Sequence, residues 1–248
     1  GLIYHTLPTA ADGTLPLERV QTALAAPHDE HEAPPGVFCL ETTHNRSGGT
    51  VLPLAYLEAA CALAREAGVP LHLDGARIFN AALALGVEAR SIAQYADTLL
   101  FCLSKGLAAP VGSIVAGPYP LIARVRRMRK LVGGGMRQAG VVAAAGIVAL
   151  TTMTARLADD HATARSLAEG LAAIPGLYVD LSRVQSNIVR FELTAGHPGP
   201  PEFLAGLRQR GVLIGQLEGN VLRAVTHYGI SSEDVRRAVA VVREVLGT

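Results

Sequence analysis

The sequence has 248 residues, half of them hydrophobic, and a mean hydropathy of +0.31. Such a chain can bury a large core, which excludes a disordered protein. Its 22 basic and 21 acidic residues leave a net charge of +1, so charge predicts neither nucleic acid nor a membrane as a partner. No signal-peptide pattern and no apolar run of roughly 20 residues is evident. The three cysteines lack metal-binding spacing, and we expect a cytoplasmic protein.

Strand-like and helix-like segments alternate in the first part of the sequence. A helix is expected at 54–67, opened by Pro53 and stopped by Gly68, and another at about 78–85. Short apolar segments predict strands at 37–41, 70–74, 98–103 and 112–117. The 98–103 run is apolar throughout, which is typical of a strand covered on both faces. This alternation predicts an open, mainly parallel α/β sheet.

The pattern changes after Gly135. Residues 139–173 are predicted to be mostly helical. Two strands at 177–181 and 187–193, strands near Val212 and Val221, a helix after Pro201 and a closing helix from Ser232 are expected to follow. We therefore predict a large domain, residues 1–155, and a smaller C-terminal α+β domain, residues 156–248.

Three polar side chains stand at the ends of predicted strands: Glu41, Asp74 and Lys105. Ligands gather at the carboxyl ends of the strands in an open α/β sheet. Lys105 has apolar neighbours, a setting that lowers a lysine pKa, although a solvated surface lysine is the alternative. Taken alone, Asp74 is more typical of a residue that caps the following helix.

A lysine and a carboxylate on two strands of one sheet suit pyridoxal phosphate (PLP) chemistry. The lysine forms the Schiff base that holds the cofactor, and the acid faces the pyridine nitrogen. Strand-end placement of both Asp74 and Lys105 therefore makes a PLP site the leading hypothesis.

Four motifs make a family resemblance specific. The chain resembles the low-specificity L-threonine aldolases, which are PLP enzymes of fold type I in the β-eliminating lyase superfamily. The motifs that carry the likeness are ETTHN (41–45), HLDGARIFNA (72–81), SKGLAAPVGS (104–113) and GGGMRQAG (133–140). The resemblance implies a PLP-dependent transferase-like large domain with a mainly parallel sheet.

The resemblance also implies roles at the cofactor. Lys105 would carry PLP as a Schiff base, Asp74 would pair with the pyridine nitrogen, and Arg77 would lie beside the ring oxygen. Lys130 and Arg137 match positions near the cofactor phosphate at a subunit boundary.

Two further residues would bind the substrate. Arg223 would grip the α-carboxylate, a task suited to a bidentate guanidinium. His31 matches a histidine near the substrate's β-hydroxyl and is a candidate for handling the hydroxyl proton.

The implied activity is cleavage of L-threonine or L-allo-threonine to glycine and an aldehyde, in a homo-oligomer (dimer or tetramer). Two alternatives stay open: another PLP lyase or racemase acting on small amino acids, or a non-catalytic truncated scaffold. The family's phosphate-binding loop, a ring-stacking histidine and a carboxylate-binding serine precede the segment that corresponds to Gly1. We therefore expect a fragment or truncated relative that binds PLP weakly by itself.

Overall fold

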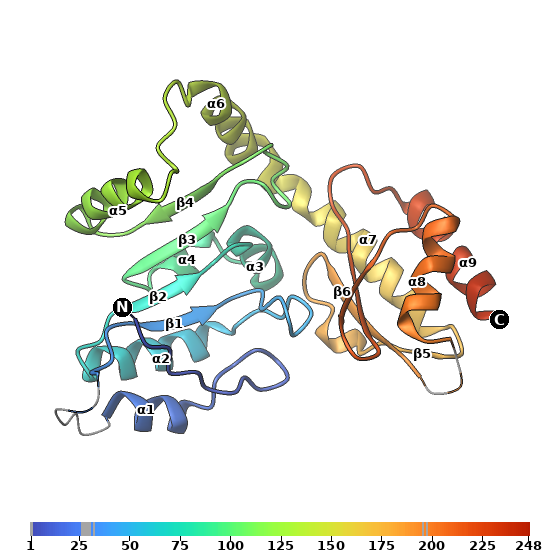
Figure 1. The fold of residues 1–248 in the computed structure, drawn as a ribbon, viewed down its shortest axis with the longest axis horizontal. Coiled ribbons are helices and arrows are strands. Elements are labelled where there is room, and N and C mark those ends of the chain that lie inside the picture. The colour runs from blue at the N-terminus through green and yellow to red at the C-terminus, as the bar shows by residue number, and fades with distance from the viewer. Residues whose placement is uncertain (1, 26–30, 32, 195, 197) are drawn as a thin grey trace.

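The computed structural model describes residues 2–25, 31, 33–194, 196 and 198–248. In this part of the chain the strands form two four-stranded sheets (Figure 1). The first sheet has the order β1-β2-β3-β4, in which the first three strands are parallel and β4 is antiparallel to β3. The strands are β1 Phe38–Glu41, β2 Leu71–Asp74, β3 Thr98–Cys102 and β4 Ser113–Ala116. The mainly parallel sheet predicted from the sequence is confirmed.

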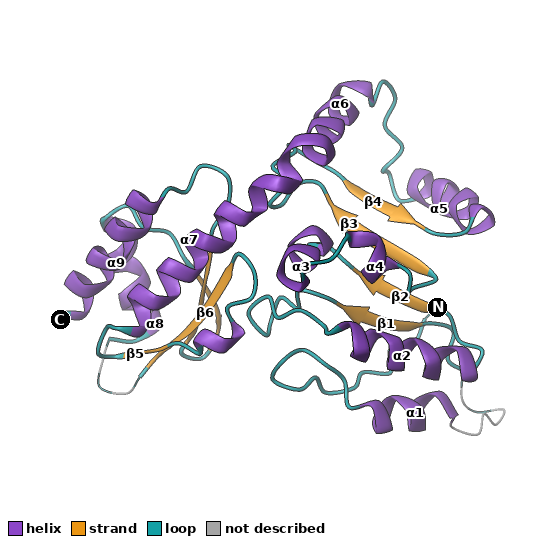
Figure 2. Ribbon diagram, turned by 180° about the vertical axis from the view of Figure 1, so that it is seen from behind, coloured by secondary structure: helices purple, strands orange, loops and turns teal. Residues whose placement is uncertain are grey.

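Helices cover the β1 side of this sheet, where α1 and α2 lie side by side (Figure 2). The core between these helices and the sheet contains Leu57, Leu71 and Leu73, which are almost completely buried. The predicted helices 54–67 and 78–85 are present within one residue, whereas two short helices, α1 and α4, were not predicted. The helices of this half are α1 Leu17–Ala25, α2 Leu54–Glu66, α3 Ile78–Leu85, α4 Ala89–Ala93 and α5 Tyr119–Leu131.

A continuous helical run joins the two sheets, as Figure 1 shows. It consists of α6 Gly140–Val148, a π-helical turn Ala149–Met153 and α7 Thr154–Ala172, and confirms the helix expected at 139–173. The predicted division between residues 155 and 156 lies inside α7, which packs against α3 on one side and against β5, β6 and α9 on the other. The two-domain division stays a prediction.

The second sheet has the order β5-β6-β8-β7 and antiparallel pairing throughout. Its core contains Phe191, Phe203 and Leu222, which are almost completely buried. The strand expected at 177–181 is shorter, because Asp180 accepts a hydrogen bond from Ser182 N (3.0 Å) and begins a 3₁₀ turn. The elements are β5 Leu177–Tyr178, β6 Ile188–Leu193, α8 Pro200–Gln209, β7 Gly215–Glu218, β8 Val221–Val225 and α9 Ser232–Leu246.

One surface of the first half exposes many apolar side chains beside the basic residues of α5, and we call it the β4–α6 surface. Every residue of β4 is exposed, α5 buries none of its residues, and β3 is half-buried along its length. The expectation that 98–103 is covered on both faces is therefore wrong. The exposed apolar side chains of this surface are Ile114, Val115, Met128, Leu131, Val132, Met136, Val141, Ile147 and Val148.

The helical run Gly140–Ala172 is, by length and composition, apolar enough to cross a membrane, with a mean hydropathy of 1.7 in its apolar window. The expectation that no such run exists is therefore wrong. A single helix of this kind is weak evidence of a span. Its second half is a core helix in which the buried Asp160 forms an ion pair with the half-buried Arg156. Only 17% of the apolar window is buried, so its first half adds to the β4–α6 surface.

Candidate functional site

A tight turn after β3 presents Lys105. Ala109 N donates to Leu103 O (3.0 Å), and Ala108 N donates to Lys105 O (2.8 Å). Ala108 has a φ of 57°, in the left-handed region that costs a residue with a Cβ about 1 kcal/mol or more. The turn holds Lys105 at the carboxyl end of β3 with its side chain exposed. The apolar surroundings expected for this lysine are not found.

Helix α7 lies directly behind the lysine. A Cβ on Gly106 would lie 2.7 Å from Leu157 Cδ2 and 3.8 Å from Asp160 Oδ2. Both of these side chains are buried. Glycine at 106 therefore lets the lysine turn approach the helix more closely than any other residue would allow.

A cavity of about 350 Å³ opens beside this turn. Strand β8 and the segment after it form the opposite wall, so both halves of the chain contribute to the cavity. Its lining residues are Arg77, Ser104, Lys105, Gly106, Ala108, Asn187, Val225, His227 and Tyr228.

Two arginines come together near this cavity. Burial lowers the pKa of Arg77, and the positive charge of Arg223 lowers it further, while Glu41 and Asp74 oppose the shift. Arg223 Nη1 also donates to Asn45 Oδ1 (2.7 Å), which ties β8 to the loop after β1. Two guanidinium groups that raise each other's energy favour a bound anion between them.

Asp74 stands at the end of β2, in register with Glu41 of β1. Its Oδ1 accepts a hydrogen bond from Ala76 N (2.9 Å), so it organises the turn into α3. It does not cap the helix: the residue at the α3 N-cap is Arg77. Asp74 has a carboxylate beside the arginine pair but is not among the residues that line the cavity.

A set of buried polar groups supports the cavity from behind. Asn187 Nδ2 donates to Thr226 O (2.6 Å), and Thr226 Oγ1 donates to Asp160 O (2.6 Å). Burial raises the pKa of Asp160, while its ion pair with Arg156 and the charge of His227 oppose that effect. The Arg156 guanidinium lies 5.2 Å from the centre of the Tyr228 ring. The segment 226–228 is thereby attached to α7.

One ring nitrogen of His227 contacts the backbone. Its Nδ1 lies 2.8 Å from Tyr228 O, and because a carbonyl can only accept, Nδ1 carries the proton. Sequence reasoning assigned no role to His227, Asn187 or Tyr228. The polar pair Ser186-Asn187, directly before an apolar strand, was the available signal for Asn187.

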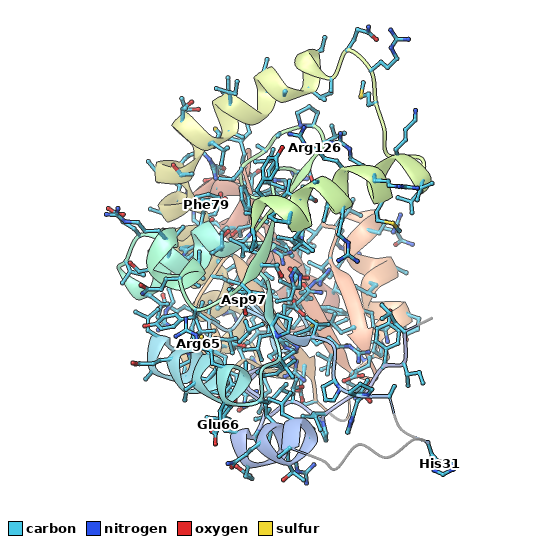
Figure 3. All side chains as sticks on the ribbon, turned by 90° about the vertical axis from the view of Figure 1, so that its left-hand side faces the viewer. His31, Arg65, Glu66, Phe79, Asp97 and Arg126 are labelled. Atoms are coloured by element: carbon cyan, nitrogen blue, oxygen red, sulfur yellow. The ribbon has the colours of Figure 1, made fainter. Side chains whose placement is uncertain are left out.

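Asp74 and Arg223 do not line the cavity but interact with Arg77, which does. Three other predicted site residues are brought neither to the cavity nor to Arg77 within this chain. His31 is exposed and lies at the edge of the molecule beyond α1, as Figure 3 shows. Lys130 is exposed near the end of α5, and Arg137 is exposed in the loop before α6. Their assignments stay predictions, and within a single chain the structure supplies no contact between them and Lys105.

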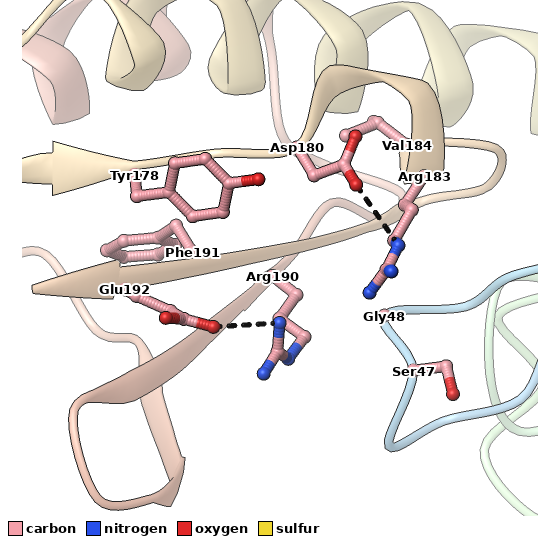
Figure 4. Close-up of a pocket in the computed structure, with 9 residues that line it drawn as sticks. All are labelled: Ser47, Gly48, Tyr178, Asp180, Arg183, Val184, Arg190, Phe191 and Glu192. Atoms are coloured by element: carbon pink, nitrogen blue, oxygen red, sulfur yellow. Dashed lines mark ion pairs between the residues drawn. The ribbon is translucent and has the colours of Figure 1, made fainter. Parts of the chain in front are cut away.

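A second cavity of about 300 Å³ lies between the loop at Gly48 and the second sheet (Figure 4). Its two arginines are neutralised, because Arg183 pairs with Asp180 (3.1 Å) and Arg190 pairs with Glu192 (3.0 Å). Its lining contains no lysine among the residues described. The Lys105 cavity is therefore the candidate active site.

The donor set around Lys105 suits PLP. It combines a lysine amine that can hold an aldehyde, a carboxylate at the next strand end, and paired arginines for anionic groups. Asn187 Oδ1, buried at the cavity, has no hydrogen-bond partner among the described residues. A buried water or a ligand group would satisfy this acceptor. The fold and the site thus define an α/β enzyme class that attaches its cofactor to a lysine.

Comparison with known proteins identifies the family. The β-eliminating lyase family matches residues 1–194. The chain is 42% identical to the low-specificity L-threonine aldolase of Escherichia coli K12, covering 94% of this chain and 67% of that protein. It is 38% identical to low-specificity L-threonine aldolase 1 of Arabidopsis thaliana, covering all of this chain and 70% of that protein.

The chain belongs to the β-eliminating lyase family, and within it to the low-specificity L-threonine aldolases. The structure of a Leishmania major threonine aldolase has the same fold, with a TM-score of 0.78 and 21% sequence identity. That likeness covers 96% of this chain and 69% of the Leishmania chain. The family resemblance and the fold class predicted from the sequence are confirmed.

Proposed function

We propose that this protein is a PLP-dependent carbon–carbon lyase that cleaves L-threonine and L-allo-threonine to glycine and acetaldehyde. The observation that carries the proposal is the cavity that places Lys105 and Arg77 together, in a chain about 40% identical to threonine aldolases. Other lyase or racemase reactions on the same scaffold are distinguished from this reaction by their products.

Lys105 would hold the cofactor covalently at the carboxyl end of β3. When bound, PLP supplies an electron sink for the pair released as the Cα–Cβ bond breaks. Asp74, at the end of the adjacent strand β2, would keep the pyridine nitrogen protonated, and Arg77 would lie beside the ring oxygen.

The substrate's α-carboxylate would bind at Arg223, whose position Asn45 maintains through the 2.7 Å hydrogen bond. The β-hydroxyl must lose its proton as the aldehyde forms. His31 is our candidate for that step. Because it lies at the edge of the molecule (Figure 3) and does not line the Lys105 cavity of its own chain, it would act from a neighbouring subunit.

Labelling of the lysine tests the proposal directly. The sequence contains two lysines, Lys105 and Lys130, so borohydride reduction of the PLP-loaded protein followed by peptide mapping gives a two-way answer. We expect the label on Lys105, glycine formation from L-threonine, and loss of both in Lys105→Ala. Lys130→Ala, the matched control, should retain the label on Lys105. A label confined to Lys130, or 2-oxobutyrate in place of glycine as the product from L-threonine, would contradict the proposal.

We also propose that the protein is a homo-oligomer, a tetramer, in which a second copy covers the β4–α6 surface. The support is the exposure of apolar side chains such as Ile114, Met128 and Ile147. Monomeric proteins rarely expose a large apolar patch, and such a patch is typical of a surface that another subunit covers. Lys130 and Arg137 border this surface and would reach the cofactor phosphate of a neighbouring subunit. Light scattering measures the mass; a stable monomer would contradict the proposal.

The cytoplasm is the location we propose. Cys39, Cys61 and Cys102 are all free thiols, which is typical of a reducing compartment. Fractionation of cells that express the protein, with detection in the soluble or membrane fraction, measures the location.

A further inference from the structure

Glu41 holds the loop that carries Asn45. It is the last residue of β1, and its Oε1 accepts a hydrogen bond from Asn45 N (2.9 Å). Asn45 Oδ1 in turn accepts from Arg223 Nη1 (2.7 Å). A continuous series of contacts therefore runs from the end of the first sheet to the arginine of β8.

The loop of residues 42–50 packs closely against the second sheet. A Cβ on Gly48, which has a φ of 91°, would lie 3.0 Å from Arg190 Cβ, and Figure 4 shows the two residues facing each other. Arg190 is the register partner of Arg223, and directly opposite residues of an antiparallel pair lie on the same face of a sheet. The loop is therefore fitted to the face of the sheet on which Arg223 lies.

The backbone of this loop is strained next to Glu41. Thr43 is buried and has a φ of 55°, a conformation that is costly for a β-branched residue. Such a conformation persists only where surrounding contacts hold it. The hydrogen bond between Glu41 and Asn45 spans Thr43, so it is one of the contacts that prevent the loop from relaxing.

The carboxylate of Glu41 is also near the arginine pair. Glu41 and Asp74 are register partners on adjacent strands, where two like charges repel each other. Arg77 offsets this repulsion, and Glu41 is the largest of the charges that raise the pKa of Arg77. The Glu41 side chain thus lies between the loop and a positively charged group of the cavity.

We propose that Glu41 is a positioning residue, which holds Asn45 so that Asn45 orients the Arg223 guanidinium toward the α-carboxylate of the substrate. The inference rests on the proposed function for one assignment, that of Arg223 to this carboxylate. Without Glu41 the loop relaxes at Thr43 and Asn45 loses its place. A misaligned guanidinium then loses the paired N–H···O contacts that make its binding of a carboxylate strong.

Two amines that differ by one carboxylate test this role. L-serine and ethanolamine are titrated into the PLP-loaded protein, and the absorbance of the cofactor gives their dissociation constants. In Glu41→Ala the serine affinity should fall about 10-fold with the ethanolamine affinity unchanged. KM for L-threonine should rise by the same factor with kcat nearly constant. Asn45→Ala should give the same loss, and the double variant should lose no more than either single variant.

Three substitutions are controls for charge, reach and location. Glu41→Gln keeps an oxygen that can accept from Asn45 N and should keep the wild-type ratio of serine to ethanolamine affinity. Glu41→Asp keeps the charge but is shorter by one methylene group, so it should behave as Glu41→Ala does and replaces that variant if it fails to fold. Glu218→Ala removes an exposed carboxylate 4.0 Å from Arg46 of the same loop and should change nothing.

Hydrogen exchange gives a measurement that needs no cofactor. In the protein without PLP, the amides of residues 42–50 should exchange faster in Glu41→Ala than in the wild type, and at the wild-type rate in Glu41→Gln.

Four outcomes would overturn the inference. Equal weakening of serine and ethanolamine in Glu41→Ala would indicate a role in the fold alone. Equal losses in Glu41→Gln and Glu41→Ala would indicate that the charge acts and the hydrogen bond does not. Additive losses in the double variant, or wild-type exchange in Glu41→Ala, would break the link to Asn45. Failure of the proposed function is a different result: no glycine from L-threonine, with the effects of Glu41→Ala on the affinity ratio and on exchange both intact.

Discussion

Replacing Gly106 with alanine should destabilise the protein through a single contact. The new Cβ would lie 2.7 Å from Leu157 Cδ2, well inside van der Waals distance. Leu157 is fully buried and cannot swing into solvent. Overpacking of this kind costs about 1–3 kcal/mol, and the lower entropy of the unfolded alanine chain returns about 0.4–1 kcal/mol. We therefore expect a net loss of about 1–2 kcal/mol, which lowers the melting temperature by a few degrees (~2–4 °C per kcal/mol).

Urea unfolding followed by circular dichroism measures this loss, and Leu157→Ala tests its cause. Leu157→Ala alone should cost about 2–5 kcal/mol, but in that background the Gly106→Ala substitution should cost nothing further, because the overlapping methyl is gone. Gly36→Ala is the matched control: nothing lies within 4 Å of the added Cβ, and its effect should stay below about 1 kcal/mol. Equal costs of Gly106→Ala in both backgrounds would refute the reasoning.

Three other perturbations follow from the site and its support. Asp74→Asn should leave PLP bound and lower turnover of threonine by about 100-fold or more. Near-normal turnover would mean that Asp74 has only a structural role, as the acceptor of the hydrogen bond from Ala76 N in the turn before α3. Arg223→Ala should raise KM for threonine strongly while Lys105 still takes the borohydride label; a lost label with unchanged KM would count against carboxylate binding. Burial holds the pKa of His161 below its ordinary 6.5, so the unfolded chain binds more protons below that pH and stability falls as the pH falls. His161→Gln, which keeps an acceptor for Asn80, should lose that dependence when unfolding is compared at about pH 5.5 and 7.5; an unchanged slope would refute it.

The sequence by itself determined the first sheet, the lysine at its edge and the family. Strand ends are readable because an apolar run stops at a polar residue, as at Asp74, and because helix boundaries are marked by proline and glycine, as at Pro53 and Gly68. The helix expected at 78–85 appears with those bounds for the same local reason. The motif around Lys105 could be recognised without tertiary information, because it is defined by the order and spacing of its residues.

Only the tertiary structure decided what faces Lys105. Asn187, His227 and Tyr228 are separated from it by more than 80 positions and meet it because α7 carries the chain back beside the first sheet. The unpaired oxygen of Asn187 depends on which way its amide turns, and that depends on the carbonyl of Thr226. The same packing leaves β3 half-buried and Lys105 exposed, because burial is a property of what neighbouring elements cover, and a local apolar pattern does not specify those neighbours.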